Sequence, residues 1–171
     1  MSKEYKVGLV GVGAVGTEMI KVLKERNFPM KGQVQVFASR ERDEQILGET
    51  YHVKKADENS FNGLDIVLFA GKTDVAIQLK DAVVKAGAKM IDNSRAFRQD
   101  PEVPLVVPQV NAEDLDWNKG VIANPNCTTM AAMPVLKVLH EDAGLERLIV
   151  STYQAVSGSG IAGAEELLGQ I

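Results

Sequence analysis

The single cysteine of the chain, Cys127, is the residue best suited to covalent chemistry, because a thiolate readily attacks carbonyl carbons. It stands in the stretch VIANPNCTT, residues 121–129. Residues 121–123 have the composition of a buried strand, and Pro125 breaks that run because the residue before a proline avoids the helical region. The sequence therefore places the thiol in a turn that follows a buried strand.

A helix is predicted directly after Cys127. Thr128 and Thr129 are candidates for the N-cap of the apolar helical run 130–140, which puts Cys127 at a helix N-terminus. The helix dipole and the unpaired N–H groups there favour the thiolate and would stabilise an oxyanion. Pro134 lies inside the run, which predicts a later helix start or a kink. Outside such a setting, a lone cysteine is more often a small buried apolar residue.

A second site is indicated near the N-terminus, where a β-rich run at residues 5–10 ends in GVGAVG and the helical pattern 17–26 follows. This is the G-x-G-x-x-G fingerprint in the strand–turn–helix setting of a dinucleotide site. The first glycine makes the turn, the second lets the backbone approach a pyrophosphate, and the third lets helix and strand pack closely. The alternative is a glycine-rich packing turn without a ligand. The candidate cofactor-binding residues are Gly11, Gly13, Ala14, Val15 and Gly16.

The end of the second predicted strand, residues 33–38, bears on the choice between NAD and NADP. An NAD site normally has Asp or Glu there to hold the ribose 2′-hydroxyl. This chain continues with Ser39, Arg40, Glu41 and Arg42. A hydroxyl and two guanidinium groups suit a 2′-phosphate, which favours NADP. The alternative is a solvated run of alternating charge over residues 40–44.

Two further predicted strands bring polar groups to the same edge of the sheet. The apolar run 64–70 is typical of a strand buried on both faces, and a helix follows that Thr73 caps and Gly87 ends. The strand 89–91 leads into a polar loop, and ligands in such folds bind beyond the carboxyl ends of the strands. The candidate ligand-binding residues here are Gly71, Asn93, Ser94 and Arg98.

The other segments carry weaker signals. Residues 43–63 are polar, with at most a short strand at 51–53, and residues 103–107 are predicted to form an edge strand or an extended connection because they contain Pro104. A strand is predicted at 148–156, followed by the flexible loop SGSG and a final helix at 162–171. The candidate site residues here are Gln154, Ser157 and Gly158, and the alternative for Gln154 is a polar residue on the wet face of a sheet.

The composition restricts the class of protein. With 171 residues, 45% hydrophobic and 25% charged, the chain suits one sizeable core and leaves room for the start of a second domain. The net charge of −4, without a clustered Lys/Arg face, argues against nucleic acid or a membrane surface as partner. One cysteine excludes an intramolecular disulfide and fits a reducing compartment, so a cytoplasmic location is expected. The sequence contains no metal-ligand cluster.

A thiol nucleophile usually works with an adjacent base, most often histidine. Only His52 and His140 are present, and both are predicted to be surface residues. His140 falls at the far end of the helix that Cys127 begins. The base is therefore expected on sequence outside this chain.

Four motifs together give the whole chain a resemblance to the N-terminal half of the aspartate-β-semialdehyde dehydrogenases. They are the glycine turn at 11–16, IDNSRAFRQDPEVPLVVPQVN at 91–111, NPNCTT at 124–129 and STYQAVSGSG at 151–160. The resemblance implies an α/β Rossmann-type doubly wound, mostly parallel sheet over residues 1–127, and the start of a second α+β catalytic and dimerisation domain over 128–171. The related N-acetyl-glutamyl-phosphate reductases, which have Gly in place of Asn126, are the alternative enzyme, and a non-catalytic NADP-binding module is the alternative from another class.

The resemblance also implies a reaction and a role for each candidate residue. Cys127 would be the nucleophile, Gln154 would position the substrate, and Arg98, with Asn126 and Ser157, would bind phosphate or the acyl phosphate. Asn93 and Ser94 would lie near the NADP, and the loop with Gly158 would border the nicotinamide. The expected reaction is the reversible reductive dephosphorylation of β-aspartyl phosphate to aspartate β-semialdehyde through a cysteine thioester, in the biosynthesis of lysine, methionine and threonine.

Three departures from the family pattern are visible. The glycine turn is one residue shorter than is usual, and Glu41 stands where the family has a cofactor-selecting Arg. The family's catalytic His, its substrate-carboxylate Arg and most of its subunit interface belong to a C-terminal half that this sequence does not contain. The isolated chain is therefore expected to bind nucleotide, to turn over poorly and to associate readily, whereas the full-length protein would be a homodimer or homotetramer.

Overall fold

The structure, a computed structural model, describes residues 3–171 apart from the side chain of Ile161. It divides into two compact units, Met1–Pro134 and Val135–Ile171, and each is described by itself. In the range 3–171, no helix is long and apolar enough to cross a membrane.

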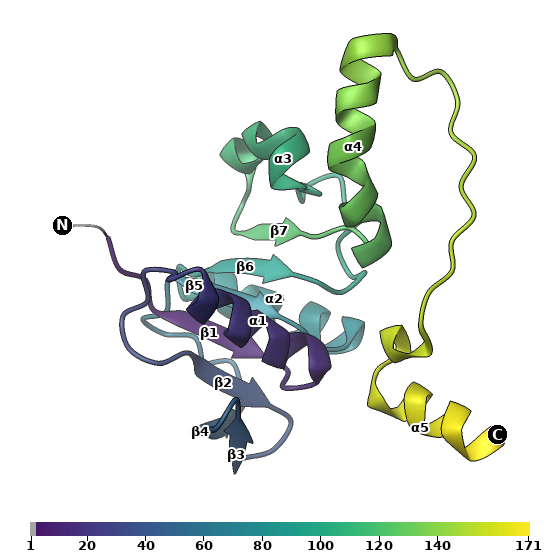
Figure 1. Cartoon of the computed structure of the whole chain (residues 1–171). Helices are drawn as coiled ribbons and strands as arrows, with labels where there is room; N and C mark the ends of the chain where they lie inside the picture. Colours follow the sequence, from purple (N-terminus) through teal and green to yellow (C-terminus); the bar gives the residue numbers. More distant parts are fainter. Residues whose placement is uncertain (1–2) are drawn as a thin grey trace. The chain divides into compact units, whose positions relative to one another are not determined.

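A twisted sheet forms the centre of the first unit (Figure 1). In the described part of the chain it has seven strands in the order β3-β4-β2-β1-β5-β6-β7, and every neighbouring pair is parallel except β3 with β4. The strands are β1 (Val7–Val10), β2 (Gln35–Ala38), β3 (Arg42–Ile46), β4 (Glu49–Lys55), β5 (Ile66–Phe69), β6 (Lys89–Asp92) and β7 (Val121–Ala123). The chain winds outward from β1 in both directions, which confirms the doubly wound, mostly parallel sheet predicted from the sequence.

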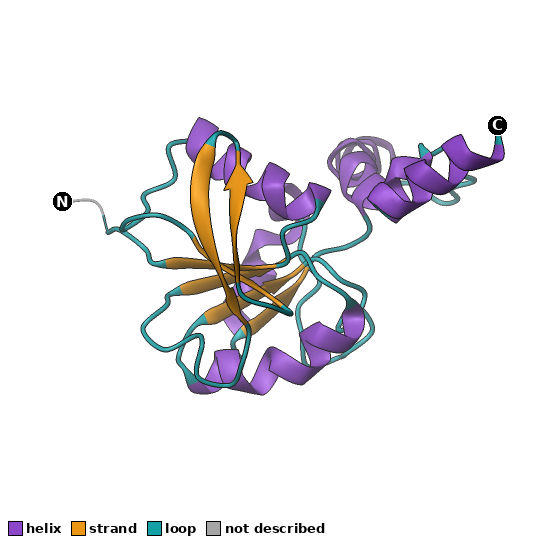
Figure 2. Cartoon of the chain, turned by 90° about the horizontal axis from the view of Figure 1, so that it is seen from below, coloured by secondary structure: helices purple, strands orange, loops and turns teal. Residues whose placement is uncertain are grey.

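Helices cover both faces of this sheet. In Figure 1, α1 (Ala14–Glu25) lies in front of the strands and α2 (Thr73–Lys85) lies behind them, and Figure 2 shows helices on both sides. Parallel neighbours require such crossovers, and β1 between them is buried along its whole length. Ile20 of α1 packs in one apolar cluster and Val83 of α2 in another, both fully buried. Thr73 begins α2 and is not its cap, because Lys72 holds the cap position without a side-chain capping bond.

The pair β3–β4 is a hairpin that the sequence does not predict beyond a short strand at 51–53. Leu47 and Gly48 both have positive φ, 53° and 80°, and join the strands in a two-residue turn of the kind that matches the twist of a hairpin. The side chains alternate strictly: Tyr51 and Val53 are buried, whereas His52 is exposed. The hairpin adds an antiparallel edge beside β2.

The connection from β6 to β7 runs through α3 (Pro108–Asn111) and the 3-10 helix η1 (Ala112–Trp117). Before α3 the chain pairs briefly with β7: the Ala123 N–H donates to the Pro104 carbonyl at 2.9 Å, and the Val106 N–H donates to the Ala123 carbonyl at 2.9 Å. This confirms the predicted extended connection.

Helix α4 (Cys127–Ala143) begins in the first unit and ends in the second, which also contains the 3-10 helix η2 (Val156–Ser159) and α5 (Ile161–Gln170). The predicted strand at 148–156 is wrong, because residues 144–155 form neither helix nor strand. Ile149 is 79% exposed, and a strand requires a neighbour that these residues do not have within the described chain. Residues 157–159 of the SGSG segment lie in η2, and Gly160 joins η2 to α5; the final helix is confirmed.

Candidate active site and cofactor cleft

The glycine turn brings the start of α1 close to the end of β1. Gly11 has φ +99°, and a Cβ there would stand 2.9 Å from the backbone carbon and oxygen of Ala70. Its N–H donates to the Phe37 carbonyl at 2.9 Å, which ties the turn to β2. Gly16 is buried, and a Cβ on it would overlap the Gly11 carbonyl oxygen. Neither position accepts a larger side chain without a shift of the backbone.

The N-terminus of α1 is open in a way that suits an anion. Gly13 holds the N-cap position, no side chain caps the helix, and its first turn has no acidic residue. A Cβ on Gly13 would meet nothing within 4 Å, so the space above the helix start is clear. The unpaired N–H groups of a helix start and its dipole attract phosphate. The backbone here therefore fits a pyrophosphate.

A cleft of about 800 Å³ lies beside the glycine turn, at the carboxyl ends of β1, β2 and β4 and the start of α2. This volume is within the range of about 300–1,000 Å³ that small-molecule sites occupy. Ser39 and Gly71 line it, as expected of cofactor-binding residues. The charged residues that line it are Arg40, Arg42, Lys55, Lys72 and Asp74, so cations predominate.

The two lysines of this cleft are absent from the predicted set. Lys55 comes to the cleft only because the hairpin places the end of β4 beside Ala38, at the end of β2. Lys72 directly follows Gly71, and its position after a strand end is a signal that sequence reasoning alone could have used. Arg42 is held by Glu44, with Nη2 and Nε 2.6 and 2.9 Å from the same carboxylate oxygen.

The loop after β6 is organised by Asp92, a fully buried carboxylate. Its Oδ1 accepts the Ser94 N–H at 3.0 Å, and its Oδ2 accepts the Ser94 hydroxyl at 2.8 Å. The Ser94 Oγ in turn accepts the Ala96 N–H at 3.0 Å. The Ser94 side chain is thus engaged within the loop, and Asp92, which sequence reasoning missed, fixes the path of the chain there.

Arg98 joins the ends of β6 and β7. Its Nε donates to the Asn124 carbonyl at 2.8 Å, and its Nη2 donates to the Asn93 carbonyl at 3.1 Å. Asn124 is three residues before Cys127, so Arg98 is attached to the turn that presents the thiol. The Nη1 group of the half-buried guanidinium makes no hydrogen bond within the described chain and is available to an anion.

Cys127 is exposed and is the first residue of α4, as predicted. The cap, however, is Asn126 and not Thr128 or Thr129: its Oδ1 accepts the Thr128 N–H at 3.1 Å and the Thr128 hydroxyl at 2.5 Å. The helix continues through Pro134, so the later start considered above is excluded. Within residues 3–171, the N–H groups of Cys127 and Thr129 have no hydrogen-bond partner, so the helix start that holds the thiol has free donors.

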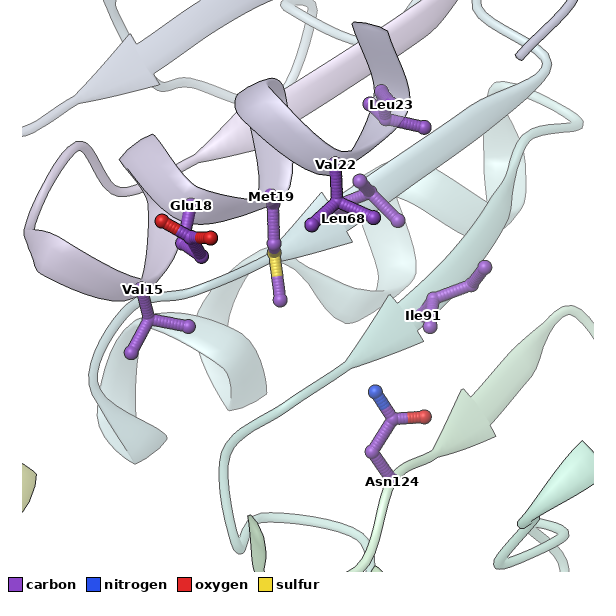
Figure 3. A pocket seen from close by; sticks show the side chains of 8 residues that line it. All are labelled: Val15, Glu18, Met19, Val22, Leu23, Leu68, Ile91 and Asn124. Atoms are coloured by element: carbon purple, nitrogen blue, oxygen red, sulfur yellow. The ribbon is translucent and has the colours of Figure 1, made fainter. Parts of the chain in front are cut away.

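An apolar groove of about 310 Å³ lies on the α1 side of the sheet (Figure 3). Val15, Met19 and Val22 of α1 line it with Leu68 of β5 and Ile91 of β6. The side chain of Val15 therefore faces this groove, and a contact from Val15 to a pyrophosphate would come from its backbone N–H.

The remaining predicted residues lie in the second unit. A Cβ on Gly158 would overlap the Gln154 amide, so the structure brings these two residues together, with Ser157 beside them in η2. His140 is in the last turn of α4, where its Nδ1 accepts the Leu145 N–H at 3.1 Å. His52 lies on the β3–β4 hairpin, and His140 belongs to the second unit. The first unit, which contains Cys127, therefore has no histidine next to the thiol.

Two family matches cover most of the chain. Residues 6–118 match the family described as semialdehyde dehydrogenase, NAD binding domain, and residues 136–171 match the semialdehyde dehydrogenase dimerisation domain. The chain is 54% identical over 168 residues to the aspartate-semialdehyde dehydrogenase of Streptomyces akiyoshiensis, a match that covers 96% of this chain and 49% of that protein. The chain spans about half the length of the curated relatives it matches.

Solved structures give the same result. The aspartate semialdehyde dehydrogenase II of Vibrio cholerae, solved in complex with ASA, has a TM-score of 0.90 and 37% identity over 99% of this chain and 52% of its own. The Candida albicans enzyme, solved with NADP, has a TM-score of 0.66 and 25% identity over 82% of this chain and 48% of its own. With its glycine turn, its doubly wound sheet and these matches, the chain belongs to the semialdehyde dehydrogenase family and contains that family's NAD(P)-binding domain.

Proposed function

We propose that this chain provides the cofactor-binding domain and the nucleophile of an aspartate-semialdehyde dehydrogenase. The observation that carries the proposal is the position of Cys127. Its thiol is exposed at the start of α4, next to unpaired backbone N–H groups, and Arg98 binds the Asn124 carbonyl three residues before it. The names of the similar proteins support this substrate over that of the N-acetyl-glutamyl-phosphate reductases.

In the proposed reaction, the Cys127 thiolate attacks the aldehyde carbon of aspartate β-semialdehyde, and the carbonyl oxygen takes the negative charge. The N–H groups of Cys127 and Thr129 stabilise this oxyanion. NADP, when bound, supplies the hydride acceptor that oxidises the adduct to a thioester. Inorganic phosphate, held by Arg98 with Asn126, attacks the thioester carbonyl, and the C–S bond breaks to release β-aspartyl phosphate and the thiolate. The biosynthetic direction is the reverse.

We assign NADP to the cleft beside the glycine turn. The open N-terminus of α1 would bind the pyrophosphate, and the cations at the ends of β2 and β4, Arg40 and Lys55 among them, would bind the 2′-phosphate. Asn93 and Ser94 are assigned to the nicotinamide end. The Candida albicans relative was solved with NADP, which supports the same choice here.

We also propose that residues 1–127 form the cofactor domain and that residues 128–171 begin a catalytic and dimerisation domain of a cytoplasmic homodimer or homotetramer. The match of residues 136–171 to a dimerisation domain supports the second assignment. Neither histidine of the chain is placed to act as base for Cys127, so the 171-residue chain alone should bind NADPH but not turn over.

Two measurements test these proposals on the purified chain. The first is NADPH binding by calorimetry, together with phosphate-dependent NADPH formation from aspartate β-semialdehyde: we expect binding without turnover. Turnover would show that a base exists within these residues, and absence of binding would refute the cofactor assignment.

The second measurement separates an enzyme from a binding module. Cys127 is the only cysteine, so its alkylation by iodoacetamide is followed without interference. Aspartate β-semialdehyde should slow the alkylation more than the same concentration of propionaldehyde, which lacks the amine and carboxylate. Equal protection by the two aldehydes would favour the binding module. In both cases Cys127→Ala should leave NADPH binding unchanged.

A further inference from the structure

The outer face of the β3–β4 hairpin carries an arrangement that the proposed reaction does not use. The His52 ring lies between two carboxylates: Nδ1 is 2.8 Å from Asp43 Oδ1, and Nε2 is 2.9 Å from Glu41 Oε1. Both contacts are hydrogen bonds only when both ring nitrogens carry a proton, that is, in the imidazolium. Asp43 is directly opposite His52 in the register, and Glu41 precedes β3.

Of these three residues, Glu41 is the one next to the cofactor cleft in the sequence. Its chain neighbours Arg40 and Arg42 both line the cleft, whereas Glu41 does not. Its carboxylate instead points to His52 on the outer face. A carboxylate at the end of the second strand of such a sheet is the group that normally holds the ribose 2′-hydroxyl of NAD and repels a 2′-phosphate. Glu41 is the first carboxylate after β2, three residues beyond Ala38, but its hydrogen bond to His52 holds it on the outer face.

We propose that His52 is a specificity-determining residue that acts through Glu41. By binding the Glu41 carboxylate on the outer face of the hairpin, His52 keeps it away from the 2′ position and leaves the cations of the cleft to select NADP. This inference rests on the proposed cofactor site.

The expected effect follows from the charges. A freed Glu41 lies next to Arg40, which has no ion-pair partner within the described chain, and an ion pair between them would remove one cation from the site of the 2′-phosphate. The same carboxylate would accept the 2′-hydroxyl of NAD. For exposed, screened charges at such separations, the preference for NADP over NAD should fall about three- to tenfold.

The experiment measures the dissociation constants of NADP⁺ and NAD⁺ at pH 6.0 for the 171-residue chain and four variants. His52→Gln should lower the NADP:NAD preference, whereas Glu41→Gln should not. The double variant His52→Gln/Glu41→Gln should regain the wild-type preference, because no carboxylate remains to be released. Asp43→Asn is the matched control, since it removes the other partner of His52 and leaves the Glu41 contact in place.

The outcomes are distinct. An unchanged preference in His52→Gln refutes the inference, as does a reduced preference that the double variant fails to restore. An equal loss in Asp43→Asn also refutes it, because the hairpin as a whole would then be responsible. Failure of the wild-type chain to bind either nucleotide overturns the cofactor assignment itself. That result differs from one in which the wild-type chain binds both nucleotides and His52→Gln leaves the preference unchanged, which refutes only the role of His52.

Discussion

Alanine at Gly13 and at Gly16 should have opposite consequences, although the two glycines are only three residues apart. At Gly16 the new methyl group would overlap the Gly11 carbonyl oxygen and stand 3.1 Å from its carbon, and both atoms are backbone that moves only with the turn. Overpacking of this kind costs about 1–3 kcal/mol, and the gain in helix propensity offsets about 0.5–1 kcal/mol. Because the methyl group would overlap backbone and not a flexible side chain, the cost should lie at the upper end of this range, and we expect a net loss of about 2 kcal/mol in the free energy of unfolding.

Gly13 offers the contrast. Its φ of −73° and ψ of −171° are open to any residue, and a methyl group there meets nothing. A weaker N-cap and a less flexible unfolded chain nearly cancel, so stability should change by less than about 0.5 kcal/mol. If the pyrophosphate passes over Gly13, however, the methyl group occupies its place, and NADPH should bind at least about tenfold more weakly, which corresponds to about 1.4 kcal/mol.

The assay is urea unfolding followed by Trp117, the only tryptophan, which lies in the first unit. At a urea dependence of about 1–3 kcal/mol per molar, the Gly16→Ala midpoint should fall by about 1 M. Gly169→Ala, in open space on α5, is the control and should leave the midpoint unchanged. A normal midpoint for Gly16→Ala would refute the close packing of α1 on the turn. Normal NADPH binding by Gly13→Ala would refute the assigned path of the pyrophosphate.

Three other predictions concern the cap, the buried carboxylate and the hairpin. Asn126→Ala removes the acceptor of the Thr128 N–H and should cost about 1 kcal/mol in urea unfolding, whereas Thr129→Ala, whose side chain does not cap, should cost little; equal values would exclude Asn126 as the cap. Asp92→Ala leaves the N–H and hydroxyl of Ser94 without a buried partner and should cost about 2–4 kcal/mol, so a loss below that of Asn126→Ala would contradict the role of Asp92 in the loop. Hydrogen bonds to Asp43 and then Glu41 raise the pKa of His52 above its ordinary value of 6.5, so the stabilisation is complete below about pH 6.5 and is lost as the pH rises through the raised pKa. The urea midpoint of the wild-type chain should therefore exceed that of His52→Gln at pH 5.5 and match it at pH 8.5, and a difference independent of pH would exclude this origin.

Local signals account for the parts of the fold that the sequence predicts correctly. The strand before the glycine turn, the helix after it and the start of α4 at Cys127 each follow from short-range patterns of apolar residues, glycine and proline. The β3–β4 hairpin is missed because the RDEQI run of β3 has one apolar residue, and its turn is Leu47-Gly48 and not one of the common Asn-Gly or Asp-Gly pairs.

The sequence predictions are wrong or incomplete where the structure depends on contacts that no local pattern shows. The run 148–156 has the apolar and β-branched composition of a strand, but nothing in the described chain pairs with it. At the start of α4 three neighbouring residues have good capping side chains, and only the backbone path around the buried Pro125 shows that Asn126 is the cap. Lys55 and Asp92 contribute to the site through contacts that are distant in sequence or hidden in a loop, and no local pattern marks them.

The two edges of the sheet have a consequence for how copies of this chain can meet. At one edge β3 carries the charged residues Arg42, Asp43 and Glu44, and charged side chains on an edge strand disfavour the addition of a further strand. At the other edge the short pairing of residues 104–106 with β7 covers part of the exposed backbone, and Pro104 has no N–H to offer a newcomer. Both borders are therefore poor templates for strand addition from another molecule. Copies of this chain should meet through surfaces other than these two edges, and concentrated samples should resist fibre formation.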